Sequence, residues 1–198
     1  GNVILSVSGQ NTRASANTQI NGITLFGQNG PVHFDDVVVS DKTGPAPNND
    51  FLGDVAVYAL FPAASGTYTQ YTSSSGNPNW QNVDENSPND DTDYNFDKTS
   101  GNKDTFIFNT LSLSALAPVY AVNLIIRAEK DDSGPRSLNG MARFPKGGGG
   151  TDYVNAVTFT LGFPYQTFDS FAIYQLDPTG SSWTVANVNN IEWGYKTV

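Results

Sequence analysis

Acidic and amide side chains stand at alternate positions in one short segment of the chain. Asp91, Asp93, Asn95 and Asp97 lie two residues apart within a longer acidic stretch. In a loop, this spacing lets oxygen atoms converge on a hard cation such as Ca²⁺. In a strand, the same spacing places all four side chains on one solvent-facing side. The segment therefore predicts either a calcium site or a solvated face, and the glycine and glutamate of an EF-hand loop are missing from it.

Aromatic residues accompany the polar stretches in the same part of the chain. Tyr71, Trp80 and Tyr94 are surrounded by Asn, Asp and Ser residues. Exposed rings stack on the apolar faces of sugars, while amides and carboxylates bind the hydroxyl groups. These three rings are therefore candidate glycan-binding residues. The alternative is that they pack in the core or in an interface.

Paired carboxylates could supply the acid and base of glycoside hydrolysis. Adjacent pairs occur at Asp35–Asp36, Asp84–Glu85 and Asp131–Asp132. Neighbouring residues in a strand point to opposite faces, so neither member of a pair could work with the other across one bond. We therefore expect a protein without enzymatic activity. The enzyme alternative is a glycan depolymerase that uses Asp84 and Asp91.

Two other features resemble catalytic motifs only superficially. His33 is the single histidine and lies inside a β-rich run, without a nucleophile-elbow motif elsewhere to partner it. The run Lys146-Gly147-Gly148-Gly149-Gly150 places its lysine before the glycines, whereas a phosphate-binding loop places it after them. We interpret His33 as a strand residue and the glycine run as a loop between two strands.

Composition narrows the class of protein further. The net charge is −9, with 10 Lys and Arg residues scattered along the chain, so no basic patch for nucleic acid is expected. Cysteine is absent, which excludes disulfides and thiolate metal sites. No apolar run is long enough for membrane insertion. Aromatic residues make up 12% of the chain, and 19 Gly and 11 Pro supply turns, which favours strands over helices.

Short strand-like runs recur between turn signals after residue 50. We expect a short helical turn near Val185–Asn190, and strands over the following ranges: Val55–Phe61, Thr105–Asn109, Val119–Ala128, Arg136–Phe144, Asn155–Leu161, Thr167–Leu176 and Ile191–Val198. No apolar period of 3.6 residues extends far enough for a long helix. This pattern predicts an all-β fold of the β-sandwich or jelly-roll type.

The first part of the chain reads as a separate and incomplete module. It holds three strand-like runs, of which Val32–Val39 is the last, and a proline-containing connector follows at Gly44–Asp50. Three strands cannot close a core alone. We therefore expect residues 1–44 to be the C-terminal strands of a broken-off module, and residues 45–198 to form one complete β-sandwich.

Segments of both modules resemble known protein domains. Val32–Val39 resembles the last strand of a laminin-G/concanavalin-A-like jelly roll. The segments Asn49–Val57, Asp90–Tyr94 and Asp177–Thr184 are similar to a module that follows such a domain in tailed-phage virion proteins. The resemblance implies a partial jelly-roll module at the N-terminus, a phage β-sandwich module after it, and membership of a virion.

The functional expectation follows from this resemblance and from the incomplete first module. We expect a structural protein of the phage particle surface, either a tail component or a capsid decoration, that acts by assembly contacts. Its partners would be other virion proteins and copies of itself, with a trimer expected because exposed strand edges need covering. No cofactor is expected apart from calcium at the acidic segment. The alternative is a carbohydrate-binding adhesin for host attachment.

Overall fold

The computed structural model describes residue 52, residues 55–169 and residues 175–198. The chain divides into two compact units, Gly1–Val57 and Tyr58–Val198, and the description concerns the second of them. The predicted boundary near residue 45, the partial jelly-roll module, His33 and the Asp35–Asp36 pair lie outside the described residues. These remain predictions.

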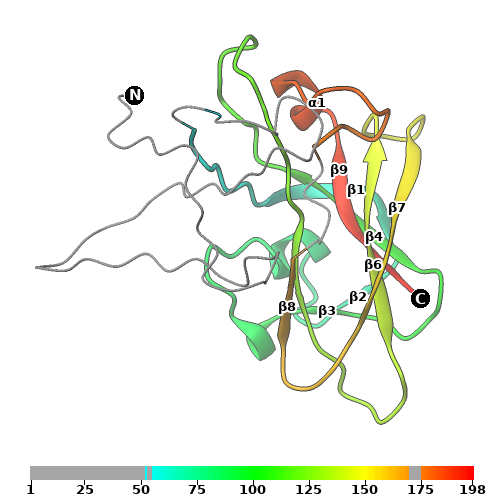
Figure 1. Ribbon diagram of the computed structural model, residues 1–198. Helices are drawn as coiled ribbons and strands as arrows, with labels where there is room; N and C mark the ends of the chain where they lie inside the picture. The colour runs from blue at the N-terminus through cyan, green and yellow to red at the C-terminus, as the bar shows by residue number, and fades with distance from the viewer. Residues whose placement is uncertain (1–51, 53–54, 170–174) are drawn as a thin grey trace, which may run out of the picture. The chain divides into compact units, whose positions relative to one another are not determined.

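A five-stranded antiparallel sheet forms the framework of the second unit (Figure 1). Its strands follow in the spatial order β1 (Pro62–Thr69), β4 (Lys103–Phe108), β9 (Glu192–Thr197), β6 (Ser137–Phe144) and β7 (Thr151–Thr160). The central strand, β9, comes from the end of the chain. The sheet can therefore form completely only when the last strand of the chain is available to pair with β4 and β6.

A second pair of strands packs on one face of this sheet. β5 (Ile125–Ala128) pairs with β8 (Gln166–Asp169) in antiparallel register. Leu124 and Ile126 join a buried cluster whose other members come mainly from the sheet and from the segment before β9: Leu138, Ala142, Phe159, Trp183, Ile191 and Trp193. Gly140 allows the close approach, because a Cβ there would lie 3.2 Å from Leu124 Cδ2. The apolar core lies between these two groups of strands.

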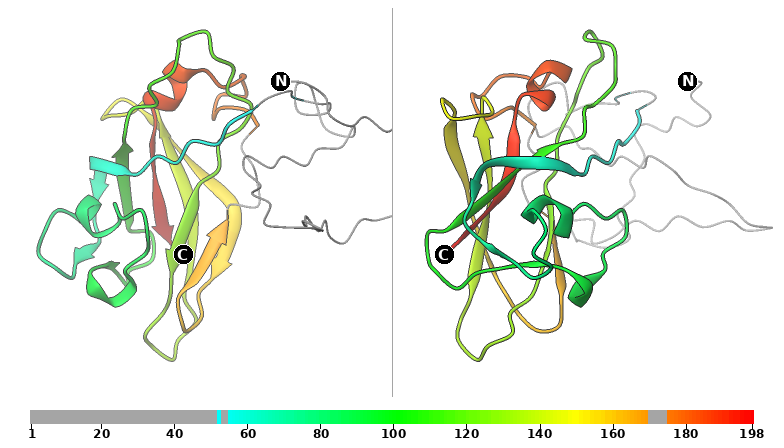
Figure 2. Two further views of the ribbon diagram at one scale, coloured as in Figure 1. Left: turned by 90° about the vertical axis from the view of Figure 1, so that its left-hand side faces the viewer. Right: turned by 180° about the vertical axis from the view of Figure 1, so that it is seen from behind.

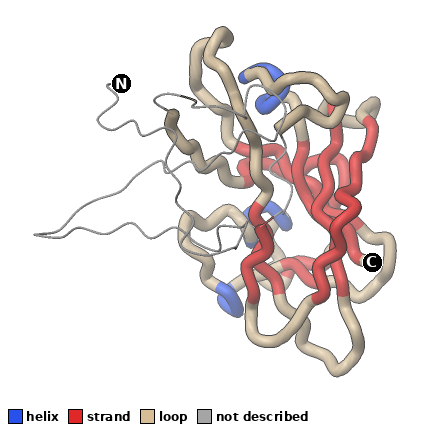
Figure 3. Tube along the Cα trace, viewed as in Figure 1, coloured by secondary structure: helices blue, strands red, loops and turns tan. Residues whose placement is uncertain are grey.

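Helix is scarce in the described part of the chain, as Figure 3 shows. It consists of α1 (Val185–Asn189) and the 3-10 turns η1 (Asn79–Asn82) and η2 (Asp90–Thr92). A further pair of short strands flanks the two 3-10 turns in the sequence: β2 (Thr72–Ser73) precedes η1, and β3 (Asn95–Phe96) follows η2. The predicted all-β class is confirmed. The predicted helical turn is also confirmed as α1, which Thr184 caps by accepting from the Asn187 backbone N–H at 3.1 Å.

One strand prediction is wrong and a second is too long, because only Ile125–Ala128 of the predicted Val119–Ala128 forms a strand. Residues 55–61 form no strand, and residues 56–59 are exposed. The first strand of the unit is instead β1, whose sequence PAASGTYT lacks an apolar alternation. β1 forms a strand because it pairs with β4. This contact is long-range, so the local sequence pattern cannot predict it. β4, β6 and β9 fall close to the predicted ranges, and β7 begins four residues earlier than predicted.

β1 carries a large bulge that brings it over the sheet. Ser65 lies opposite Phe106 and Thr69 lies opposite Asp104, so β1 has extra residues between these two pairs. Gly66 sits in the bulge, where a Cβ would lie 2.5 Å from Thr105 Oγ1 and 2.6 Å from Glu192 Oε2. Only glycine allows the bulge to come this close. Figure 2 shows β1 beside β4 from two further directions.

Candidate functional site

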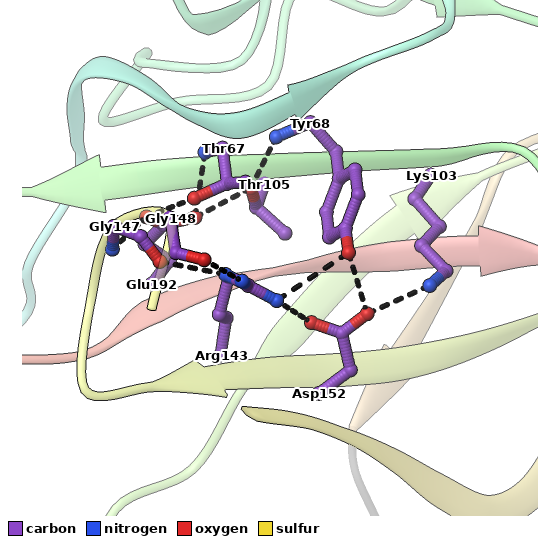
Figure 4. A network of polar contacts seen from close by, with 9 residues as sticks. All are labelled: Thr67, Tyr68, Lys103, Thr105, Arg143, Gly147, Gly148, Asp152 and Glu192. Atoms are coloured by element: carbon purple, nitrogen blue, oxygen red, sulfur yellow. Dashed lines mark hydrogen bonds and ion pairs between the residues drawn. The ribbon is translucent and has the colours of Figure 1, made fainter. Parts of the chain in front are cut away.

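The densest set of charged contacts lies beneath the β1 bulge (Figure 4). Glu192, on the central strand, is only 1% exposed. Its carboxylate accepts from the backbone N–H and the hydroxyl of Thr67 at 2.7 and 2.8 Å, from Thr105 Oγ1 at 2.7 Å, and from the Gly147 N–H at 2.8 Å. A buried carboxylate is tolerated because four donors replace its water.

Arg143 continues this network along the sheet. Its Nε donates to the Gly147 carbonyl at 2.9 Å, and one terminal nitrogen donates to the Gly148 carbonyl at 3.0 Å. The other terminal nitrogen pairs with Asp152. The guanidinium also lies over the ring of Tyr68, 5.4 Å from its centroid. Arg143 therefore fixes the glycine-rich loop between β6 and β7, which was predicted as a connecting loop.

Asp152 completes the network at the edge strand β7. Besides Arg143, it accepts from Lys103 Nζ at 2.7 Å and from the Tyr68 hydroxyl at 2.9 Å. Burial acts to raise the pKa of Asp152, but the hydrogen bonds from these three residues outweigh it and lower that pKa. The pKa of Glu192 is lowered in the same way, because its hydrogen bonds from Thr67, Thr105 and Gly147 outweigh the effect of burial.

The contacts of this network link strands of the five-stranded sheet to one another. Glycoside hydrolysis requires one carboxyl group that stays protonated and another that is ionised. Here both Glu192 and Asp152 are held ionised, and the two carboxylates are balanced by Arg143 and Lys103. We interpret the set as an electrostatic clamp that joins β1, β4, β6, β7 and β9.

The predicted calcium residues lie in several local structures. Asp91 belongs to η2, Asp93 follows it and accepts from Asn89 Nδ2, and Asn95 belongs to β3. The amide of Asn95 is engaged internally: it donates to the Asn79 carbonyl at 2.8 Å and accepts from Asn82 Nδ2 at 2.9 Å. Among the described residues, no group of three or more His, Cys, Asp or Glu side chains is arranged to hold a metal ion.

Asp97, the last residue of the predicted calcium set, follows β3. Its Oδ1 accepts from the Thr99 N–H at 3.2 Å, while its Oδ2 is buried without a hydrogen-bond partner in the described structure. The side chain of Asp104 is fully buried, and burial raises its pKa. The nearby negative charge of Asp97 raises the pKa of Asp104 further. The calcium site stays a prediction.

The predicted glycan residues have different surroundings. Tyr71 packs edge-on against Tyr195, with ring centroids 4.9 Å apart, and its hydroxyl lies 2.5 Å from Thr197 Oγ1. Burial raises the pKa of Tyr71 to about 12. Trp80 is half-buried in η1, whereas Tyr94 is 38% exposed and packs against Phe96. Only Tyr94 of the three presents an exposed ring, and a site made from all three stays a prediction.

A second charged cluster lies on the exposed side of the β5–β8 pair. Arg127 of β5 donates to both carboxylate oxygens of Asp90, from Nε at 2.5 Å and from its terminal nitrogen at 2.7 Å. The guanidinium lies over the ring of Tyr165, 5.4 Å from its centroid. The Tyr165 hydroxyl lies 3.5 Å from Asp91 Oδ1. We call the set Asp90, Asp91, Arg127, Glu129 and Tyr165 the Arg127 face.

The Arg127 face carries a surplus of negative charge. Burial and the charges of Asp91, Asp90 and Asp131 raise the pKa of Glu129, against the backbone N–H of Tyr165, which lowers it. Burial and the charges of Asp91, Glu129 and Asp90 raise the pKa of Tyr165 to about 12. Asp90 itself adopts a left-handed backbone conformation with φ of 50°, which is uncommon for a residue other than glycine and often marks functional sites.

Sequence reasoning missed this face, although it selected Asp91 for another role. Its members come from η2, from β5 and the residue after it, and from the residue before β8, and these three segments are each more than 30 residues apart in the sequence. Arg127 and Tyr165 fall inside or beside predicted strands but carry no motif. Only the pairing of β5 with β8 and the position of η2 bring them together.

Comparison of the chain with protein-family models, curated proteins and solved structures gave no significant match. In the described ranges, no helix has the length and apolar character needed to cross a membrane. The functional argument therefore depends on the chemistry of the two clusters.

Proposed function

We propose that this chain is a structural protein of a tailed-phage particle surface that acts by assembly contacts rather than by catalysis. Its two modules would be jelly-roll or β-sandwich domains, and it would assemble with copies of itself and with other virion proteins. The resemblance of Asn49–Val57, Asp90–Tyr94 and Asp177–Thr184 to a module of tailed-phage proteins supports the virion assignment. The all-β architecture agrees with it.

The observation that carries the proposal is the contrast between the two charged clusters. The carboxylates beneath the β1 bulge are saturated by internal donors, whereas the Arg127 face is open to solvent. Large apolar side chains are also exposed on and after β5 and before β8: Ile125 is 60% exposed and Phe163 is 77% exposed. Aromatic and arginine side chains with exposed apolar neighbours are typical of protein–protein interfaces.

Two measurements test the proposal. Mass spectrometry of gradient-purified phage particles from a lysate that expresses this chain should detect its peptides at a constant ratio to the major capsid protein. Analytical ultracentrifugation of the purified chain should detect a closed oligomer, with a trimer expected. Absence from the particles, together with a well-folded monomer at micromolar concentration, would overturn the proposal.

A carbohydrate-binding adhesin is the second candidate, and the exposed ring of Tyr94 favours it. Tyr94 lies beside Phe96, and both rings are exposed, at 38% and 49%, as rings that stack on the apolar faces of sugars must be. A glycan array probed with and without EDTA tests this candidate and its calcium dependence together. Binding should be lost in a Tyr94→Ala variant and kept in a Trp80→Phe variant. No binding in either condition removes the candidate.

A further inference from the structure

We propose that the Arg127 face is a docking surface for a segment of a partner protein that carries Lys or Arg side chains. The proposal rests on the assembly function proposed above and names the chemistry of the partner at one surface. It uses the placement of β5 residues, the arrangement of charges around Arg127, and the exposed apolar side chains that flank them.

The alternation of β5 decides which side chains face outward. Leu124 and Ile126 are each 8% exposed and belong to the core. Ile125 and Arg127, between and after them, point to the opposite side, where Ile125 is 60% exposed. Arg127 also donates to Thr167 of β8, its cross-strand partner, at 3.4 Å. The outer side of the β5–β8 pair therefore offers an apolar side chain next to a fixed guanidinium.

Charge on this face is unbalanced. The carboxylates of Asp90, Asp91 and Glu129 gather there, and Asp131 lies close enough for its charge to raise the pKa of Glu129. Two cations lie among them in sequence, but each is already engaged. Arg127 holds Asp90 through two hydrogen bonds, and the ammonium of Lys130 donates to the Gly134 carbonyl at 2.8 Å. Within the described part of the chain, Asp91, Glu129 and Asp131 have no ion pair.

Charge complementarity selects the occupant. A partner ammonium or guanidinium would meet Asp91 and Glu129, and its carbon stem would cover the half-buried ring of Tyr165 or the exposed side chain of Ile125. A second copy that used the same face would bring two acidic clusters together, in a chain whose net charge is already −9. Nucleic acid would be repelled for the same reason. The basic partner is therefore a different protein.

The Asp90–Arg127 ion pair fixes the side chains of this surface in the absence of a partner. Two hydrogen bonds fix the guanidinium against Asp90 and over the Tyr165 ring, so Tyr165 is held in place from one side. A partner would meet a surface that is already ordered, which lowers the entropy cost of docking. In this arrangement Asp90 is a positioning residue, whereas Asp91 and Glu129 contact the partner.

Fluorescence anisotropy with defined peptides tests the proposal. The probes are an octapeptide of alternating Lys and Val, and a neutral counterpart with Gln in place of Lys. The full chain should bind the Lys peptide in low salt, and binding should weaken as salt is added. The double variant Asp91→Asn with Glu129→Gln should weaken binding about tenfold, because it removes the two carboxylates proposed to contact the partner while keeping their shapes.

A matched control separates docking from general attraction to an acidic protein. The double variant Asp84→Asn with Glu85→Gln changes the net charge equally at carboxylates that are not members of the Arg127 face, and it should change the affinity less than about twofold. Circular dichroism must show the same fold and melting temperature for both variants. Equal weakening in the two double variants overturns the proposal, as does equal binding of the Lys and Gln peptides.

The outcomes also separate this proposal from the proposed function. If the chain is found in purified particles but no Lys-dependent binding occurs, the docking surface is wrong and the virion assignment stands. If the Lys peptide binds as expected but the chain is absent from particles, the virion assignment fails and the docking surface stands. Competition of the Lys peptide by a neutral oligosaccharide would assign this face to the adhesin candidate instead.

Discussion

Thr67 and Glu192 lie 125 residues apart in the sequence, yet two groups of Thr67 donate hydrogen bonds to the Glu192 carboxylate, at 2.7 and 2.8 Å. These contacts join the bulged first strand to the central strand of the sheet. Because Glu192 is 1% exposed, its charge depends on internal donors rather than on water. The fold of the unit is therefore sensitive to any change in this carboxylate.

The substitution Glu192→Gln should destabilise the protein by about 3 kcal/mol. One carboxylate oxygen would be replaced by an amide NH₂ group, which would face the hydrogen-bond donors that now bind that oxygen. Urea denaturation followed by tryptophan fluorescence measures the change. The control Thr67→Val removes one hydroxyl but keeps the backbone hydrogen bond, so it should cost only about 1 kcal/mol. Equal stability of Glu192→Gln and the native chain would show that the clamp is not structural.

Stability should fall with acidification through the pKa values of the clamp. The pKa values of Glu192 and Asp152 are lowered in the folded state from the ordinary values of 4.5 and 3.8 for these side chains. Their contribution is therefore present above these values and is lost as the pH falls below them. Asp104 acts in the opposite direction, since burial raises its pKa. Melting temperatures from about pH 6 to about pH 3 should fall less for Glu192→Gln than for the native chain.

Gly194 should not tolerate a side chain. A Cβ there would lie 1.9 Å from the Asp104 carbonyl oxygen and 2.8 Å from the Thr105 Cα, both of which belong to the neighbouring strand. Gly194→Ala should therefore separate β4 from β9 and cost about 3 kcal/mol. Gly148→Ala is the control, because nothing lies within 4 Å of a Cβ there. It should melt at the native temperature; a similar loss in both variants would contradict the close strand contact.

Neighbouring isoleucines of β5 test the packing of this strand on the sheet. Ile126 is 8% exposed and Ile125 is 60% exposed. Ile126→Ala should cost about 3 kcal/mol by leaving a cavity in the core, whereas Ile125→Ala should change stability by less than about 0.5 kcal/mol. Chemical denaturation of both variants measures the difference. The reverse order would mean that β5 presents its other side to the sheet.

Local patterns predicted several elements because the cause of each is local. Thr184 is a good helix cap, and its hydroxyl accepts from the N–H three residues later, so the short helix α1 could be expected at Val185. β4, β6 and β9 were predicted because apolar and aromatic residues recur within short runs bounded by turns. β1 was missed because its sequence is small and polar, and its pairing with β4 depends on residues some 40 positions away.

The candidate sites show the same division. The acidic segment was recognised from its alternating residues, but the structure divides it between η2 and β3, and a local spacing could not foresee this break. The Arg127 face could not be found at all, because Asp90, Arg127 and Tyr165 carry no motif that links them. Their meeting depends on the antiparallel pairing of β5 with β8, which brings distant residues together.

The sequence by itself determined that this chain is an all-β protein, because side-chain alternation and turn chemistry act over a few residues. It also determined the acidic character that any partner must accommodate. Only the tertiary structure decided which carboxylates are buried in a saturated clamp and which stay open, because that depends on long-range strand order. Glu192 meets Thr67, and Asp90 meets Arg127, only after the sheets have formed.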